Sequence, residues 1–234
     1  MGGKLGYIAR YLSKLSKKEI LWLATHACKH NHSYLEHMAC YFKEMPQEMK
    51  PKPEIIGFLD IEASNLSADF GFVFSWAIKD LDGEIHGRVL TKKEIQSPSL
   101  DKKLLREFVK QVKKYDKVVV HYGAPGRFDI PFLRTRCLYH KLDFPLYREI
   151  LVEDTYTMAK QRLKLSRNRL ENIAVFFNIP CKEHKMNPSM WQKALMGNTR
   201  ALNYIWRHNK EDVITLELVW KKLSKYAPRR RLSI

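Results

Sequence analysis

The sequence lacks the features that mark several large classes of protein. It has no run of about 18 apolar residues, which excludes an ordinary transmembrane helix. Its basic N-terminal residues lack the apolar stretch of a secretory signal, so we expect an intracellular protein, cytoplasmic or nucleoid-associated, that is not secreted. Only 4 of its 234 residues are cysteine, which is too few for a disulfide framework and fits a reducing compartment.

Acidic residues are also scarce relative to basic ones. Lys and Arg number 42 against 25 Asp and Glu, which gives a formal net charge of +17. Residues 1–53 carry 9 basic and 4 acidic side chains and residues 160–234 carry 17 and 5, whereas residues 54–159 carry 16 of each. A basic excess confined to certain segments favours nucleic acid as the partner. We further expect that partner to be single-stranded, with DNA favoured over RNA. A solvated basic surface is the alternative.

The residue pattern changes along the chain and predicts three parts. Residues 1–50 have apolar side chains at helical spacing, which indicates a small helical extension. The proline-rich stretch 45–54 is typical of a linker. Residues 54–226 alternate short apolar runs with amphipathic segments and are expected to form an α/β domain, and residues 227–234 form a basic tail.

The α/β domain is expected to contain a mixed sheet with flanking helices. The expected elements, in order, are strands at 54–63, 71–80 and 84–92, a helix at 97–116, a strand at 117–123, a helix at 128–141, a strand at 150–158 and helices from 167 to 226. The Asp82-Gly83 pair predicts a tight turn between the second and third strands. Three antiparallel strands followed by βα units give a mixed sheet with helices on its faces.

Acidic residues stand at the ends or starts of three of these elements. Asp60 and Glu62 end the first strand, and strand alternation puts both carboxylates on one face. Asp129 follows the fourth strand, and Asp212 lies in a late helix, one turn after His208. Four oxygen donors that converge in this way suit two Mg²⁺ or Mn²⁺ ions, which can hold the attacking water and the leaving oxygen of a phosphodiester. Taken singly, Asp129 is equally explained as a helix cap and Asp212 as the partner of a lysine.

Three segments resemble the motifs of the DEDD family of 3′–5′ exonucleases. They are FLDIEA at the first strand, VVVHYGAPGRFDIPFLRTR at the fourth strand and HNKEDVITLELVW in the late helix. Over about residues 54–225, the chain is most similar to the YprB-like predicted exonucleases within this family. The resemblance implies an RNase H-like fold, two divalent metals bound by Asp60, Glu62, Asp129 and Asp212, and hydrolysis of single-stranded DNA or RNA from the 3′ end.

His208 departs from the family's pattern. The family's general base is either a histidine five residues before the final aspartate or a tyrosine four residues before it. Here Arg207 and His208 stand at those two positions before Asp212. His208 therefore brings histidine chemistry to the tyrosine position, where a neutral imidazole can accept a proton near pH 7. A surface histidine is the alternative, and His121 is then the next candidate for the base.

Residues around the motifs are candidates for supporting roles. Asn65, Arg134 and Arg136 are candidate nucleic-acid contacts, with a turn residue and an ordinary basic helix face as the alternatives. Asp154, at the end of the fifth strand, is expected to cap the helix that follows.

Two cysteines and three histidines fall within 13 residues of the N-terminal segment. Cys28, His32, His37 and Cys40 are the expected ligands of a Zn²⁺ ion, with His30 as the alternative to His32. A histidine-rich helical hairpin with two buried cysteines is the other interpretation. A zinc ion would stabilise a segment of about 50 residues that can barely build a hydrophobic core.

The same residues admit two functions besides the exonuclease. One is a catalytically inactive nucleic-acid-binding module with a nuclease-like fold, and the presence of all four carboxylates argues against it. The other is an endonuclease or resolvase on the same fold, and the Phe-Asp-x-Pro of the second motif argues against that one.

Overall fold

The structure is a computed structural model that describes residues 12, 15–44, 54–180, 187–226 and 232–233. The chain divides into two compact units, residues 1–53 and 54–234, which we describe separately. Within the described ranges, no helix is both long enough and apolar enough to span a membrane.

The described part of the N-terminal unit contains two short helices and the loop between them. Helix α2 (Lys17–Thr25) starts at a capping box, in which Ser16 and Glu19 each accept a hydrogen bond from the other's backbone N–H. Helix α3 (Met38–Glu44) follows the loop. The buried hydrophobic residues of the core between the helices are Leu23, Met38 and Tyr41. The helical character expected of this segment is therefore confirmed for its described residues.

The second unit is built on a six-stranded sheet in the order β3-β2-β1-β4-β5-β6. The strands are β1 (Ile56–Ala63), β2 (Val73–Asp80), β3 (Ile85–Val89), β4 (Lys117–Val120), β5 (Leu151–Asp154) and β6 (Leu232–Ser233). Strands β1, β2 and β3 are antiparallel, whereas β4 runs parallel to both β1 and β5. The expected mixed sheet is thus confirmed. Strand β6, within the expected tail, adds an antiparallel edge to β5 that the sequence did not predict.

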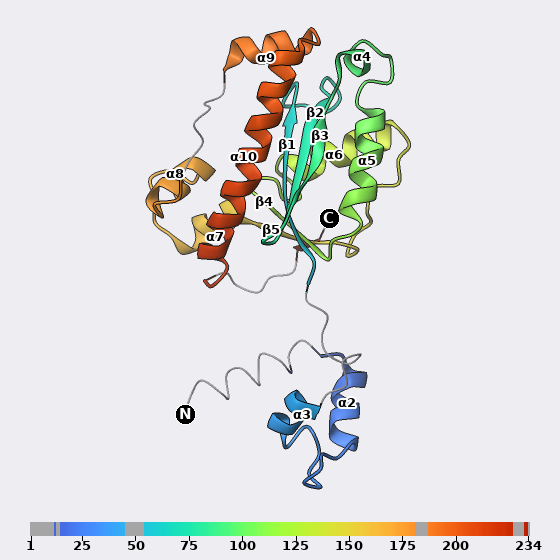
Figure 1. Ribbon diagram of the computed structural model, residues 1–234, viewed down its shortest axis with the longest axis vertical. Helices are drawn as coiled ribbons and strands as arrows, with labels where there is room; N and C mark the ends of the chain where they lie inside the picture. The colour runs from blue at the N-terminus through green and yellow to red at the C-terminus, as the bar shows by residue number, and fades with distance from the viewer. Residues whose placement is uncertain (1–11, 13–14, 45–53, 181–186, 227–231, 234) are drawn as a thin grey trace. The chain divides into compact units, whose positions relative to one another are not determined.

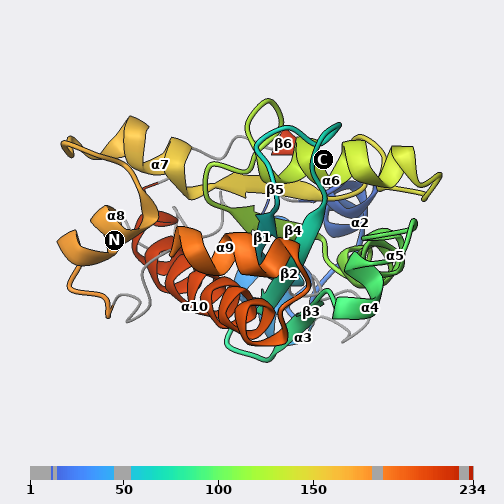
Figure 2. The same cartoon turned by 90° about the horizontal axis from the view of Figure 1, so that it is seen from above.

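Helices cover both faces of this sheet (Figures 1 and 2). They are α4 (Lys92–Ile95), α5 (Lys102–Val112), α6 (Asp129–Tyr139), α7 (Thr155–Arg162), α8 (Leu170–Phe176), α9 (Pro188–Leu195) and α10 (Thr199–Leu223). Leu59 and Ile61 of β1 pack in the cluster that contains the buried residues of α5 and α6. Phe58 packs with Val213 and Leu216 of α10 on the opposite face. Even-numbered residues of β1 therefore face α10, because side chains alternate along a strand.

The fifth strand is shorter than the sequence predicts. The expectation of a strand over 150–158 is wrong beyond Asp154, because helix α7 begins at Thr155. The carboxylate of Asp154 accepts hydrogen bonds from the backbone N–H groups of Tyr156 and Thr157, which are otherwise unpaired in the first turn. The prediction that Asp154 caps this helix is confirmed.

Arg136 is part of a buried ion-pair network and is not a nucleic-acid contact. Its Nε and Nη2 atoms donate to the two carboxylate oxygens of Asp101, at 3.0 and 2.8 Å. The same carboxylate lies 2.7 Å from Nε2 of His140 and accepts from the backbone N–H of Val73. With only 5% of its surface exposed, Arg136 has no access to a phosphate. The expectation for this residue was wrong because its acidic partner lies 35 residues away in the sequence.

We expect Arg136→Met to lower the free energy of unfolding by about 3–5 kcal/mol, because it leaves the buried carboxylate of Asp101 without its cation. Urea denaturation followed by circular dichroism measures the change. Arg134→Met, on the same helix but half-buried, is the matched control and should shift the midpoint much less. Equal midpoints for the two variants would show that the network contributes no net stability.

Candidate functional site

Among the described residues, two groups of side chains are arranged so that they can hold a metal ion. Glu62, His208 and Asp212 form one group in the second unit, and their ligand atoms all lie within 4.8 Å of one another. The other group, in the N-terminal unit, combines two cysteines with two histidines and is described after the first.

The first group forms where α10 crosses the end of β1. Glu62 is on the face of β1 that meets α10, and His208 and Asp212 lie one turn apart on the helix. Nε2 of His208 is 3.8 Å from Oε1 of Glu62 and 3.8 Å from Oδ2 of Asp212. All three side chains are buried. Two carboxylates and an imidazole that converge away from water are a suitable donor set for a cation.

Asp60 joins the same face through Asn209, a residue that the sequence analysis missed. Nδ2 of Asn209 donates a hydrogen bond of 2.6 Å to Oδ2 of Asp60. Asn209 is fully buried, and its own Oδ1 has no hydrogen-bond partner. The only sequence signal was its place beside His208 and three residues before Asp212. Asn209 fixes one carboxylate oxygen of Asp60, so the orientation of that carboxylate is set by α10.

Asp129 reaches β1 from the start of α6, the helix that follows β4 in the chain. It is the first residue of α6, and its Oδ1 accepts a hydrogen bond of 3.2 Å from the backbone N–H of Ile61. Burial raises the pKa of Asp129 to about 7, and the charges of Asp154 and Asp212 act in the same direction. A Cβ atom at Gly123 would lie 2.3 Å from Oδ2 of Asp129, so only glycine permits this close approach.

Asp154 and His121 have other roles in the structure. Besides capping α7, Asp154 accepts hydrogen bonds from the backbone N–H groups of Tyr122 and Ala124 and so holds the loop after β4. His121 lies in that loop with its Nδ1 2.9 Å from Oγ1 of Thr155. Burial lowers the pKa of His121 to about 4, against the opposing charge of Asp154. His121 is not among the residues of the metal group.

The two remaining candidate contacts are outside the metal group. Asn65 is exposed in the loop after β1, and its Oδ1 accepts a hydrogen bond from the backbone N–H of Ser67, which is a turn geometry. Arg134 is half-buried on α6, with its guanidinium 5.6 Å from the centre of the Phe144 ring. The structure therefore places neither residue against the carboxylates.

Arg127 is a basic residue near the site that the sequence analysis missed. It stands two residues before Asp129, and its guanidinium lies 4.8 and 4.5 Å from the ring centres of Tyr122 and Tyr156. Tyr122 is 48% exposed. The two ring centres are 4.9 Å apart, so the guanidinium lies beside both rings, with its Nε 3.7 Å from Oδ2 of Asp154. A cation and an exposed ring at the edge of an acidic site provide both charge and a stacking surface.

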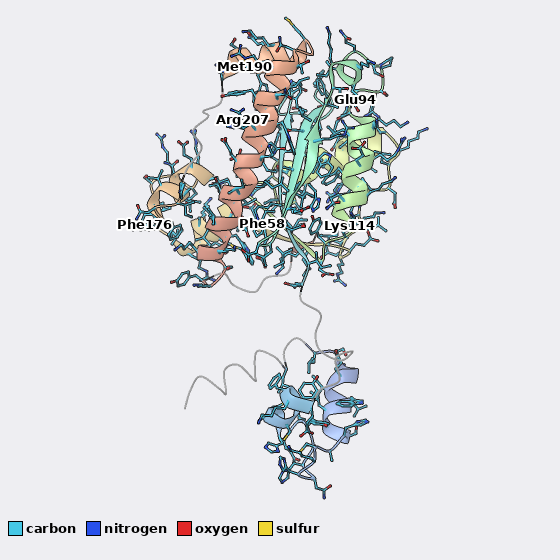
Figure 3. All side chains as sticks on the ribbon, in the orientation of Figure 1. Phe58, Glu94, Lys114, Phe176, Met190 and Arg207 are labelled. Atoms are coloured by element: carbon cyan, nitrogen blue, oxygen red, sulfur yellow. The ribbon has the colours of Figure 1, made fainter. Side chains whose placement is uncertain are left out.

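Arg207 and His208 differ in the direction they face. Arg207 is exposed on α10 (Figure 3). His208, by contrast, is buried, with its Nε2 3.8 Å from Oε1 of Glu62. The exonuclease family that this chain resembles places its general base at one of these two positions, and here His208 is the one that lies beside the carboxylates.

The group in the N-terminal unit consists of Cys28, His30, His37 and Cys40. It contains His30, the alternative that the sequence left open, in place of His32. The backbone N–H of Cys28 donates to the carbonyl of His32, and that of Asn31 donates to the carbonyl of Cys28. These bonds close a tight turn. The ring of His32 packs edge-on against His37, with ring centres 5.5 Å apart.

Comparison with known proteins gives the family and the fold. A family model described as the RNase_H superfamily matches residues 57–224. No curated protein matches the chain. The family B DNA polymerase from the hyperthermophilic archaeon Pyrobaculum calidifontis is 19% identical over 74% of this chain, with a TM-score of 0.61. The chain spans only 25% of that polymerase. A structure titled "apo form of the nuclease" is 18% identical, with 74% of this chain and 72% of that one covered and a TM-score of 0.48. The expected RNase H-like fold is confirmed.

The raised pKa of Asp129 predicts a specific pH dependence of stability in the metal-free protein. The folded state binds this proton more tightly than the unfolded state, whose carboxyl has a pKa near 3.8, so stability is lost as the pH rises from there through about 7. We expect the free energy of unfolding in EDTA to fall between about pH 4 and 7, and Asp129→Asn to flatten that fall. Asp143→Asn, an exposed partner of Lys113, is the control that should keep the parent's slope. An unchanged slope in Asp129→Asn would contradict the prediction.

Proposed function

The chain belongs to the RNase H superfamily, and on that premise we propose that its second unit is a metal-dependent 3′–5′ exonuclease of the DEDD group, related to the YprB-like enzymes. Its substrate would be single-stranded DNA or RNA, whose phosphodiester bonds it would hydrolyse. The observation that carries this proposal is the convergence of Glu62, His208 and Asp212 where α10 crosses β1. Asp60 on the same face of β1 and Asp129 against Ile61 extend the acidic set.

The donor set fits hard divalent cations. Asp60, Glu62, Asp129 and Asp212 would hold two Mg²⁺ or Mn²⁺ ions, since carboxylate oxygens are the ligands these ions prefer. The raised pKa of Asp129 supports this assignment, because a bound cation would offset both the burial and the neighbouring carboxylate charges that raise it. The buried Oδ1 of Asn209 has no hydrogen-bond partner in the structure, which supports a further polar group, such as a metal-bound water, beside it. Such ions supply a polarised water and stabilise the charge that develops on the leaving oxygen.

Because the four carboxylates would hold the ions, the imidazole of His208 would stay unbound, and it is proposed as the residue that accepts the proton of the attacking water. Its imidazole lies between two carboxylates at 3.8 Å from each, which is close enough to contact a water held at the group. Burial on α10 fixes the position of the imidazole beside the two carboxylates. The chain's own contribution to the reaction is then to orient the water and to take up its proton.

Single-stranded substrate is supported by the residues beside Asp129. Arg127 offers a charge for a phosphate, and the half-exposed ring of Tyr122 offers a stacking surface for an unpaired base. The basic excess of residues 160–234, 17 basic against 5 acidic side chains, supports binding to a polyanion. We propose DNA as the preferred substrate over RNA, and the assay below compares the two.

We expect Asp60→Asn to abolish hydrolysis while oligonucleotide binding persists, because one ligand charge is lost and the basic residues remain. The assay uses 5′-labelled single-stranded DNA and RNA oligonucleotides with Mn²⁺, with Mg²⁺ and with EDTA. Asp69→Asn, an exposed aspartate in the loop after β1, is the matched control and should retain full activity.

The pattern of products distinguishes the three functions. A ladder that shortens from the 3′ end, only when metal is present, supports the exonuclease. Internal cuts by the parent protein would indicate an endonuclease or resolvase instead. Binding without any cleavage would indicate an inactive nucleic-acid-binding module.

Replacement of His208 tests the proposed base. We expect His208→Ala to lower the hydrolysis rate by roughly 10²–10⁴, the usual contribution of a positioned acid–base group, while metal binding survives. His208→Tyr should retain more activity than the alanine variant, because the resembling family has tyrosine at this position. His86→Ala, which removes a histidine that pairs with Asp80, is the control and should not change the rate. A His208→Ala variant as fast as the parent would place the base elsewhere.

A further inference from the structure

We propose that the N-terminal unit binds one structural Zn²⁺ ion through Cys28, His30, His37 and Cys40. The four ligand atoms lie within 4.8 Å of one another. They come from two places: the turn that follows α2, and the residues at the start of α3. This inference concerns a different unit from the nuclease site and is independent of the nuclease proposal.

The distances agree with four-coordinate zinc. Sγ of Cys28 is 3.5 Å from Nδ1 of His37 and 3.9 Å from Nδ1 of His30, and Sγ of Cys40 is 3.2 Å from Nδ1 of His30. Zn–S bonds of about 2.3 Å and Zn–N bonds of about 2.0–2.1 Å in a tetrahedron place the ligand atoms roughly 3.3–3.8 Å apart. These three separations scatter around that range, and all pairs of ligand atoms lie within 4.8 Å, so an ion fits among the four atoms with modest side-chain movements.

The donor types and their burial favour a closed structural site. Two sulfur and two imidazole ligands are typical of zinc that leaves no position open for substrate. Both cysteines are buried, whereas His37 is half-buried and His30 is exposed. A buried pair of thiols beside two imidazoles can lose its protons to a metal and bind it as thiolates.

The N-terminal unit also has a physical need for such an ion. The buried hydrophobic side chains of its described core are Leu23, Met38 and Tyr41, a small set for an independent unit. The proposed ligands would tie the turn after α2 to the first residues of α3. Metal binding would therefore supply folding free energy that this core provides only in part.

The other two histidines of the segment are held in different contacts. His26 stacks on Trp22 with ring centres 4.1 Å apart, and its Nδ1 lies 2.9 Å from the backbone carbonyl of Trp22. His32 packs against the edge of His37. Both residues lie outside the group that can hold the metal. They therefore serve as matched controls of the same residue type in the same unit.

The test uses the full-length protein, reduced and reconstituted with Zn²⁺ or Co²⁺. We expect one zinc per chain by elemental analysis, and with Co²⁺ the visible absorption bands of tetrahedral coordination by two thiolates. His30→Ala and Cys40→Ser should each weaken Co²⁺ binding by at least about 100-fold, because losing a ligand costs at least as much as losing a group that supports one. His26→Ala and His32→Ala should bind Co²⁺ as the parent does.

Rescue separates loss of a ligand from loss of folding. His30→Cys supplies a thiolate at the same place, so it should restore Co²⁺ binding with stronger thiolate-to-metal absorption than the parent. Three outcomes would overturn the proposal. They are a reduced protein that takes up no zinc, an equal loss of binding in His32→Ala and His30→Ala, and a Cys28–Cys40 disulfide found by mass spectrometry in protein purified without reductant.

Discussion

The crossing of α10 over one face of β1 is the contact on which the candidate site depends. Phe58 packs in one cluster with Val213 and Leu216, and its ring meets Trp220 edge-on at 5.5 Å. This apolar contact fixes both the rotation and the position of α10 along the strand. One turn earlier on the helix, the same face carries polar side chains, which meet the carboxylates at the end of β1. The hydrophobic contact therefore places the acidic one.

Most of the strand core and the sheet order follow from patterns that the sequence displays directly. The continuous apolar runs of β1 and β2 and the Asp82-Gly83 turn indicate the antiparallel part, because strands that are buried on both faces have few polar side chains. The alternation of side chains along a strand predicts that Asp60 and Glu62 share a face. What the sequence does not display is the helix that this face meets, since α10 lies roughly 150 residues farther along the chain.

The points that the sequence left open or predicted wrongly have two physical causes, a polar partner distant in sequence and a local backbone hydrogen bond. The sequence around Arg136 is that of a basic helix face. Its partner Asp101 precedes a different helix, α5, and is distant in the sequence. His30 and His32 are indistinguishable by spacing, and the turn closed by Cys28 and Asn31 decides between them. Asn209 belongs to no sequence motif, and its role is visible only in its hydrogen bond to Asp60. In each case the role of the residue follows from the position of one partner in the folded structure.

Buried carboxylates elsewhere in this chain meet cations, and that contrast bears on the candidate site. Asp101 is paired with Arg136. Glu217 lies 2.6 Å from Lys79, and although burial alone would raise the pKa of Glu217, its lysine partners hold it below the usual range. Asp129 has the opposite surroundings: its buried carboxyl faces the charges of Asp154 and Asp212, and its pKa is raised. The fold neutralises its structural carboxylates with arginine and lysine. At the end of β1 it instead gathers acidic side chains around Asp129, which is the electrostatic arrangement that a bound divalent cation would complete.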